Sequence, residues 1–190
     1  MDSLATMDKV LQETKRVVDG IEPAQLDNPT PCTEWTVRDV LNHITAGARM
    51  FAIAAEQGSV PDDQLGELIM GDNLGDDYRA SFRSAADDAI TAFSAPGVLD
   101  KMVVLPFGEM PAGVGLNIAI FDVSTHTWDL AQGSGQQTQF DPDVLESAFA
   151  IAQQMMSDDL RATGQFGPEV VVADDAPTLQ RLAGLCGRAF

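Results

Sequence analysis

The feature that most constrains this chain is a series of long segments in which apolar residues recur at spacings of three and four. In the segment that begins at Thr36, for example, Val40, Ile44 and Phe51 all belong to one such stripe. This spacing places apolar side chains on one face of an α-helix. Helices with one apolar face bury it against each other, so the pattern predicts an all-α bundle.

Glycine and proline residues divide the periodic segments into separate elements. Residues 58–72 are predicted to be a loop with weak helical character, residues 102–107 an extended segment or small hairpin, and residues 169–173 a further extended piece. Helices are predicted over residues 3–19, 36–57, 74–95, 111–133, 141–164 and 177–185. No repeat or linker divides the chain, so residues 1–190 are expected to form one domain. We expect an antiparallel four-helix bundle with short extra extended segments and a small C-terminal helix.

The charge balance limits the classes of partner. Eleven basic residues against 29 acidic ones give a net charge of −18, which disfavours binding to nucleic acid or to an anionic membrane. The first residues lack the basic start and long apolar run of a signal peptide, and no stretch is long enough to span a membrane. Cys32 and Cys186 form no disulfide framework. We therefore expect a cytoplasmic protein with reduced thiols.

Three residues point to a metal site. Asp122 and His126 are four positions apart, so a helix places them one turn apart on one face. His43 and His126 are the two histidines of the chain, and both lie on apolar stripes. Two imidazoles and one carboxylate on facing helices make a three-ligand site for a divalent transition metal, with a coordination position left open as in working sites.

A histidine on an apolar stripe is more often a core residue than a ligand, and this reading stays open for His43 alone. Gly47, one turn later, removes bulk beside that imidazole. The stripe through Asp122 and His126 is small and polar, whereas a packed core would be large and apolar. A buried carboxylate is costly unless it is paired or coordinated, so a simple hydrogen bond between Asp122 and a histidine is the competing explanation.

Two segments resemble a known family. They are TPCTEWTVRDVLNH at residues 30–43 and DVSTHTWDLA at residues 122–131, followed by Gly133, Gly135 and Gln136. FGP at residues 166–168 and DDAP at residues 174–177 fit the same pattern. The chain resembles the DinB-like metal-binding proteins of actinobacteria, which are related to the N-terminal domain of mycothiol-dependent maleylpyruvate isomerase. The resemblance spans nearly the whole chain.

The resemblance implies a DinB-like four-helix bundle that binds a divalent metal, usually zinc or nickel. The histidine of the first motif corresponds to His43, and the acid and histidine of the second correspond to Asp122 and His126. The isomerase has a glutamate where this chain has Asp122, and the shorter aspartate would hold a metal closer to its own helix. The chain also ends without room for the isomerase's additional C-terminal domain. These departures argue against a direct transfer of the isomerase activity.

Other residues near the predicted ligands are candidates for supporting roles. Asp129 is predicted to accept the free ring N–H of a ligating histidine, to add to the metal shell, or to be an exposed acid in the last helical turn. Cys32 is a fourth ligand, a reactive thiol or, more simply, a buried free cysteine. Trp35 and Trp128 flank the ligand segments and are expected to pack there or to line the pocket mouth.

Few basic residues are available to bind an anionic substrate. Arg49, Arg79 and Arg83 are the candidates, because an anion would need at least one of them. Pairing with the abundant surface acids is the simpler role for all three.

Three functions are compatible with this pattern. The first is an enzyme in which the metal binds a low-molecular-weight thiol, by resemblance mycothiol, which then attacks an electrophilic substrate in a transfer or isomerisation. The second is a metal-dependent hydrolase that activates water. The third is a non-catalytic metal-binding stress or binding protein. The sequence leaves both a monomer and a homodimer open.

Overall fold

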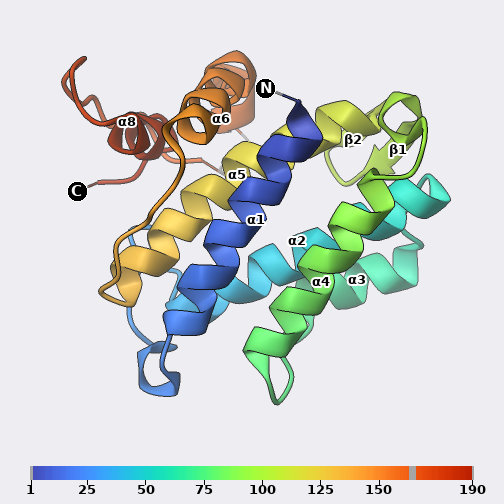
Figure 1. The fold of residues 1–190 in the computed structure, drawn as a ribbon, viewed down its shortest axis with the longest axis horizontal. Helices are drawn as coiled ribbons and strands as arrows, with labels where there is room; N and C mark the ends of the chain where they lie inside the picture. Colours follow the sequence, from blue (N-terminus) through green and yellow to red (C-terminus); the bar gives the residue numbers. More distant parts are fainter. Residues whose placement is uncertain (1, 163–165, 190) are drawn as a thin grey trace.

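Four long helices form the body of the protein (Figure 1). The structure is a computed structural model that describes residues 2–162 and 166–189. The bundle consists of α1 (Ser3–Gly20), α2 (Val37–Gln57), α4 (Tyr78–Phe93) and α5 (Ala112–Gly133). Helix α1 packs against α5 and α4, and α2 packs against α4 and α5, so the four helices close into a ring. The predicted all-α, DinB-like bundle is confirmed. The prediction that the helices are antiparallel holds for α1 with α4 and α2 with α5, whereas α1 with α5 and α2 with α4 are parallel.

Contacts between the helices show their relative directions. Ser3 bonds to Asn117 and Thr14 to Thr127, so α1 and α5 run parallel. Helix α4 runs antiparallel to α1, because Lys15 pairs with Asp87 near the middle of both helices and the hydroxyl of Tyr78, at the start of α4, donates to Ile21 at the end of α1. Phe51 and Phe93 meet near the ends of α2 and α4, which are therefore parallel neighbours.

The junction between α2 and α5 matters most for the site. The first residue of α2, Val37, lies beside Gly133, at the end of α5. Phe51, near the end of α2, lies beside Gly115, near the start of α5. These two helices are therefore antiparallel, and residues in the first half of α2 face residues in the second half of α5. His43 meets Asp122 and His126 for this reason.

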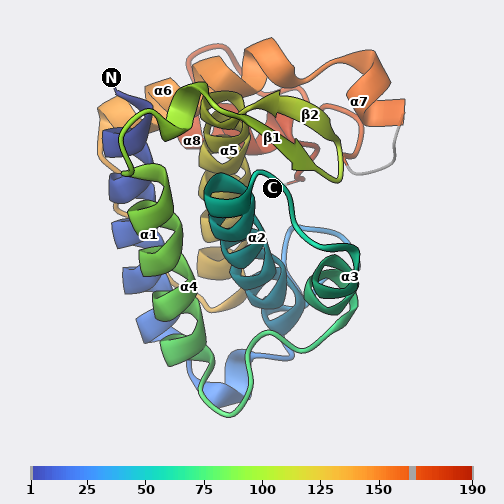
Figure 2. The same ribbon diagram turned by 90° about the vertical axis from the view of Figure 1, so that its right-hand side faces the viewer.

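Smaller elements cover the bundle (Figure 2). The hairpin of β1 (Met102–Leu105) and β2 (Gly108–Pro111) is antiparallel, with Val103 opposite Met110, and confirms the predicted extended segment. Helices α6 (Pro142–Met155), α7 (Asp158–Ala162) and α8 (Thr178–Leu185) follow α5, and α6 and α8 pack against each other and against α5. The single-turn helices are η1 (Pro23–Gln25) and η2 (Val98–Asp100).

Local signals set several helix ends as predicted. Thr36 and Asp39 form a reciprocal capping box at the start of α2, and Gly58 ends that helix in the left-handed conformation. Asp141 caps α6 through the backbone N–H of Asp143, with Pro142 in the first turn.

The helix prediction is wrong in three places. Residues 58–72 contain a regular helix, α3 (Asp62–Met70), whose short length and interior Gly66 hide its periodicity. Helix α4 starts at Tyr78, because Asp77 caps it, and not at residue 74. Helix α6 ends at Met155, and α7 follows after a break; the predicted end at residue 164 lies outside the described residues.

The predicted extended piece at residues 169–173 forms no strand in the structure. It is irregular chain, tied to α8 by the backbone bond from Val170 to Gly184. Among the described helices, none combines the length and the apolarity that a membrane-spanning segment needs.

Candidate metal centre

The three predicted ligand residues come together between α2 and α5. His43 Nε2 lies 3.5 Å from Asp122 Oδ2, and His126 Nε2 lies 3.6 Å from Asp122 Oδ1. One ligand atom from each of the three residues lies within 4.8 Å of the others. The sequence spacing supplies the pair on α5, and the antiparallel packing of α2 supplies the third residue.

These separations suit a small divalent cation. Zinc binds imidazole nitrogen and carboxylate oxygen at about 2.0–2.2 Å, so two ligands of a tetrahedral ion lie roughly 3.4 Å apart. The two nitrogen–oxygen separations, one to each oxygen of Asp122, are close to that edge length. Both imidazoles direct Nε2 at the same carboxylate, as convergent ligands would. The chemistry of the residues therefore fits zinc or nickel.

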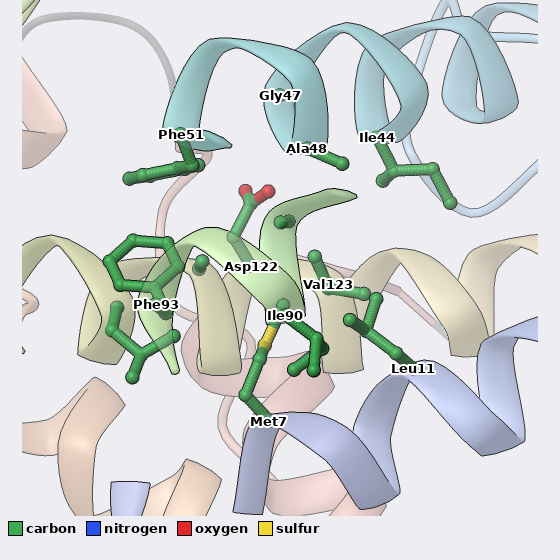
Figure 3. Close-up of a pocket in the computed structure, with 13 residues that line it drawn as sticks. Met7, Leu11, Ile44, Gly47, Ala48, Phe51, Ile90, Phe93, Asp122 and Val123 are labelled. Atoms are coloured by element: carbon green, nitrogen blue, oxygen red, sulfur yellow. The ribbon is translucent and has the colours of Figure 1, made fainter. Parts of the chain in front are cut away.

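Asp122 borders an apolar cavity of about 20 Å³ (Figure 3). In Figure 3 its carboxylate points from α5 toward α2, while Met7, Phe51 and Phe93 supply apolar surroundings. Burial raises the pKa of this carboxyl, but the neighbouring His126 and the hydrogen bond with His43 outweigh burial and lower the pKa to about 2. The Asp122 carboxylate is therefore anionic at neutral pH.

The side chain of His43 is the most exposed of the three, at 41%. Burial lowers the pKa of this imidazole, but the hydrogen bond and the charge of Asp122 outweigh burial, and the pKa lies above 6.5. A metal ion has to displace this proton before it can bind Nε2.

His126 is buried, and its ring contacts a second carboxylate, that of Asp129. Its Nδ1 lies 3.0 Å from Asp129 Oδ2, and Asp129 has no exposed side-chain surface. An ionised carboxylate only accepts hydrogen bonds, so Nδ1 is the donor in this contact, and the ring is oriented with Nε2 toward Asp122. The expectation that Asp129 accepts from a histidine is confirmed, and the exposed-acid alternative is wrong.

Arg188 completes this arrangement, and the sequence reasoning missed it. Its Nη2 donates to Asp129 Oδ2 at 2.9 Å, and its Nη1 donates to the carbonyl of Cys186 at 2.8 Å. Arg188 follows α8, 59 residues after Asp129, so no periodic pattern connects the two. The available signal was that a carboxylate inside an apolar helix needs a cation.

Trp35 covers both histidines. Its ring stacks on His126 at 5.6 Å between centroids and tilts against His43 at 5.0 Å. A turn from Cys32 to Trp35, closed by a 3.0 Å backbone bond, sets this position. Glu34 in that turn has φ of 70°, the only positive φ among the described non-glycine residues. Residues kept in this region cost about 1–3 kcal/mol and cluster at functional sites.

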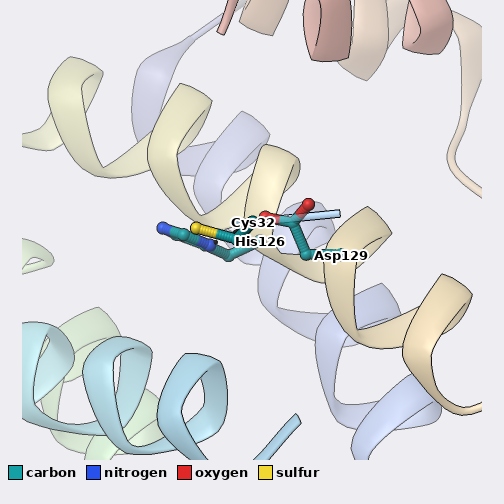
Figure 4. Close-up of side chains that lie close together, drawn as sticks. All are labelled: Cys32, His126 and Asp129. Atoms are coloured by element: carbon teal, nitrogen blue, oxygen red, sulfur yellow. Dashed lines mark hydrogen bonds and ion pairs between the residues drawn. The ribbon is translucent and has the colours of Figure 1, made fainter. Parts of the chain in front are cut away.

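Cys32 offers a second grouping with His126 and Asp129 (Figure 4). The arrangement suits a metal less well. His126 Nδ1 and Asp129 already bond to each other, and the Arg188 guanidinium beside Asp129 would repel a cation. Burial also raises the pKa of the Cys32 thiol to about 11, so the thiolate is scarce at neutral pH. Cys32 is a half-buried free cysteine, the simplest of the predicted roles.

None of the three arginines predicted for an anionic substrate reaches this centre. Arg79 donates to the backbone carbonyl of Ile21, and Arg83 pairs with Asp19. Arg49 donates to Asn73. Trp128 is buried and does not line the pocket beside His43, whereas Trp35 lines it as expected.

Comparison with known proteins places this chain in a family. Residues 7–131 match the mycothiol maleylpyruvate isomerase N-terminal domain, a range that includes all three candidate ligands. The chain belongs to the mycothiol maleylpyruvate isomerase N-terminal domain family. The match begins within α1 and ends within α5, so it spans nearly all of the bundle that holds the candidate site.

Relatives extend the likeness to the whole chain. Uncharacterized proteins from two strains of Mycobacterium tuberculosis are 30% identical over 189 residues, which is 99% of this chain and 98% of theirs. The crystal structure of the mycothiol-dependent maleylpyruvate isomerase has a similar fold, with a TM-score of 0.65 at 15% identity. The alignment covers 92% of this chain and 76% of that one. A histidine-to-alanine variant of the isomerase gives a TM-score of 0.64 at 14% identity.

Proposed function

We propose that this protein is a divalent-metal-dependent enzyme of mycothiol chemistry, with zinc or nickel held by His43, Asp122 and His126. In the reaction a low-molecular-weight thiol attacks an electrophilic substrate, in an isomerisation or a transfer. The observation that carries the proposal is the convergence of three ligand atoms from two helices within 4.8 Å. Membership of the mycothiol maleylpyruvate isomerase N-terminal domain family supports mycothiol as that thiol.

A cation bound there would act as a Lewis acid and lower the pKa of a coordinated thiol toward neutrality. The chain's own residues favour the binding of such a cation. Asp122 supplies a permanent negative charge, and Asp129 fixes the ring of His126 so that Nε2 faces the site. The exposure of His43 leaves the outer side of the centre open to a small molecule.

For isomerisation, the thiolate sulfur donates an electron pair to one carbon of a double bond conjugated to a carbonyl group, and the carbon–sulfur bond forms as the π pair moves to the carbonyl oxygen. Rotation about the resulting carbon–carbon single bond and return of that pair break the carbon–sulfur bond, which regenerates the thiolate and leaves the isomerised substrate. In a transfer the carbon–sulfur bond persists: a leaving group departs with the electron pair of its bond to the attacked carbon, and the product is a thioether. Trp35 shields both imidazoles from bulk water on one side.

Metal content decides the first part of the proposal. Wild-type protein, reconstituted with zinc or nickel and passed through a desalting column, should retain about one equivalent by mass spectrometry. His43→Gln, Asp122→Asn and His126→Gln should each lose most of it. Asp88→Asn, which removes an exposed carboxylate from α4, is the matched control and should keep the metal. A folded wild type that binds neither metal contradicts the proposal.

Thiol dependence decides the second part. Addition of mycothiol to cobalt-substituted protein should change the visible spectrum of the metal, and turnover of an electrophile should require the thiol. Turnover without any thiol would instead identify a metal-dependent hydrolase. A metal spectrum that no thiol perturbs would identify a non-catalytic metal-binding protein.

A further inference from the structure

An open pocket lies directly beside the candidate metal centre. Its volume is about 630 Å³, within the range of small-molecule sites. His43 and Trp35 line it together with other residues of α2, with α3 and with Pro106 of the hairpin turn. A substrate that reaches the exposed side of His43 therefore occupies this pocket.

The walls of this pocket are apolar and acidic. Its apolar side chains are Trp35, Ala46, Met50, Leu68, Ile69 and Pro106. Glu34 and Asp39 add two carboxylates. Asp39 accepts hydrogen bonds from Thr36, which lower the pKa of its carboxyl, so it stays anionic.

Outside the proposed metal centre at His43, the pocket offers no cationic side chain to balance an anionic ligand. The structure describes all eleven lysine and arginine side chains, and none of them lines the pocket. Arg49 comes nearest through hydrogen bonds: it donates to Asn73, whose backbone N–H donates to Asn42 in the pocket wall. The Asn42 amide also donates to the Gly71 carbonyl, so its oxygen and its nitrogen are both engaged.

We propose that the pocket selects an apolar electrophile that carries no anionic group, an inference that rests on the proposed function. Apolar walls favour a hydrocarbon or aromatic body, whereas Glu34 and Asp39 repel a carboxylate. The isomerase of similar fold is named for maleylpyruvate. Maleylpyruvate carries two carboxylates and is therefore a poor match for these walls.

A matched pair of electrophiles tests the selection. Benzyl chloride and para-(chloromethyl)benzoate differ by one carboxylate remote from the reacting carbon. In both, the thiol sulfur bonds to the methylene carbon, chloride leaves with the electron pair of the carbon–chlorine bond, and the thiol proton passes to the buffer. With zinc-loaded protein and mycothiol, kcat/KM divided by the uncatalysed rate should favour benzyl chloride at least about tenfold, or about 1.4 kcal/mol.

Two charge-reversed variants link the selection to the pocket. Glu34→Lys should raise the relative rate of the carboxylate substrate about tenfold, because it replaces a repelling charge with an attracting one. Glu56→Lys makes the same change on α2 outside the pocket wall and should leave the ratio unchanged. Equal rates for both substrates in the wild type would overturn the proposal and leave the proposed function intact.

Equilibrium binding distinguishes a failure of the proposed thiol chemistry from a failure of the proposed charge selection. Quenching of tryptophan fluorescence by para-nitrobenzyl alcohol and by para-nitrobenzoate measures the same charge preference without turnover. If neither chloride reacts, the transfer chemistry is wrong, while tighter binding of the alcohol still supports the pocket's selectivity. Equal or tighter binding of the benzoate overturns it.

Discussion

His126 Nδ1 lies 3.0 Å from Asp129 Oδ2, one helical turn farther along α5. The contact fixes the ring so that its other nitrogen faces Asp122 on the same helix, beside His43 of α2. Asp129 has no exposed side-chain surface, and its charge is balanced by Arg188 from the C-terminal segment. Arg188 is therefore coupled, through Asp129, to the orientation of His126, a candidate ligand.

Replacement of Arg188 by Met should lower the free energy of unfolding by about 3–5 kcal/mol, because it leaves the Asp129 carboxylate buried without its cation. Urea denaturation of the metal-free protein measures the loss. The double variant Asp129→Asn with Arg188→Met should recover part of it. Arg83→Met breaks the exposed pair with Asp19 and should cost no more than about 1 kcal/mol. Equal losses at the two arginines would contradict this account.

Asp129→Asn should weaken the proposed metal binding about 10–100-fold, because the amide holds the His126 ring less firmly than the carboxylate does. Competition with a chromophoric chelator measures the dissociation constant under conditions where circular dichroism shows a folded variant. Asp19→Asn removes a carboxylate remote from the site and is the control. An unchanged metal affinity in Asp129→Asn would show that the contact has only a structural role.

Gly47→Ala should stabilise the protein by about 0.5–1 kcal/mol, because a Cβ at this helical position meets no atom within 4 Å. Gly66→Ala in α3 has equal space and should give a similar gain. Gly133→Ala should instead destabilise by about 1–3 kcal/mol, because its Cβ would lie 2.6 Å from Val37 Cγ2. Thermal denaturation of the three variants checks the order, and a loss at Gly47 would show that its open space is filled in solution.

The pH dependence of stability should have opposite signs without and with metal. The pKa of His43 is raised above 6.5 in the folded protein, so its contribution is complete below that value and is lost as the pH rises through the folded pKa. Metal-free wild type should therefore lose stability relative to His43→Gln as the pH rises above about 6.5, the ordinary pKa of histidine. The stabilisation by added zinc should increase over the same range, because the imidazole must be deprotonated to bind. Melting temperatures measured at several pH values test both signs.

Much of the fold could be predicted from local patterns. The capping box of Thr36 and Asp39 and the glycine at Gly58 set the ends of α2 because they act within one or two helical turns. Asp141 and Pro142 did the same for the start of α6. The prediction failed where the local signal was weak: α3 is short, has a glycine in its interior and buries no residue fully.

The candidate site was also predictable in part from local sequence patterns. The four-residue spacing of Asp122 and His126 determined that they share a helix face, and the apolar stripe of α2 indicated that His43 faces the bundle. The sequence by itself could not supply Arg188 or the pocket wall formed by α3 and the hairpin turn. Helix periodicity is a local property of the backbone and can be read from a few turns of sequence. Pairing of a buried charge and enclosure of a pocket depend on segments far apart in the chain, so only the tertiary structure decided them.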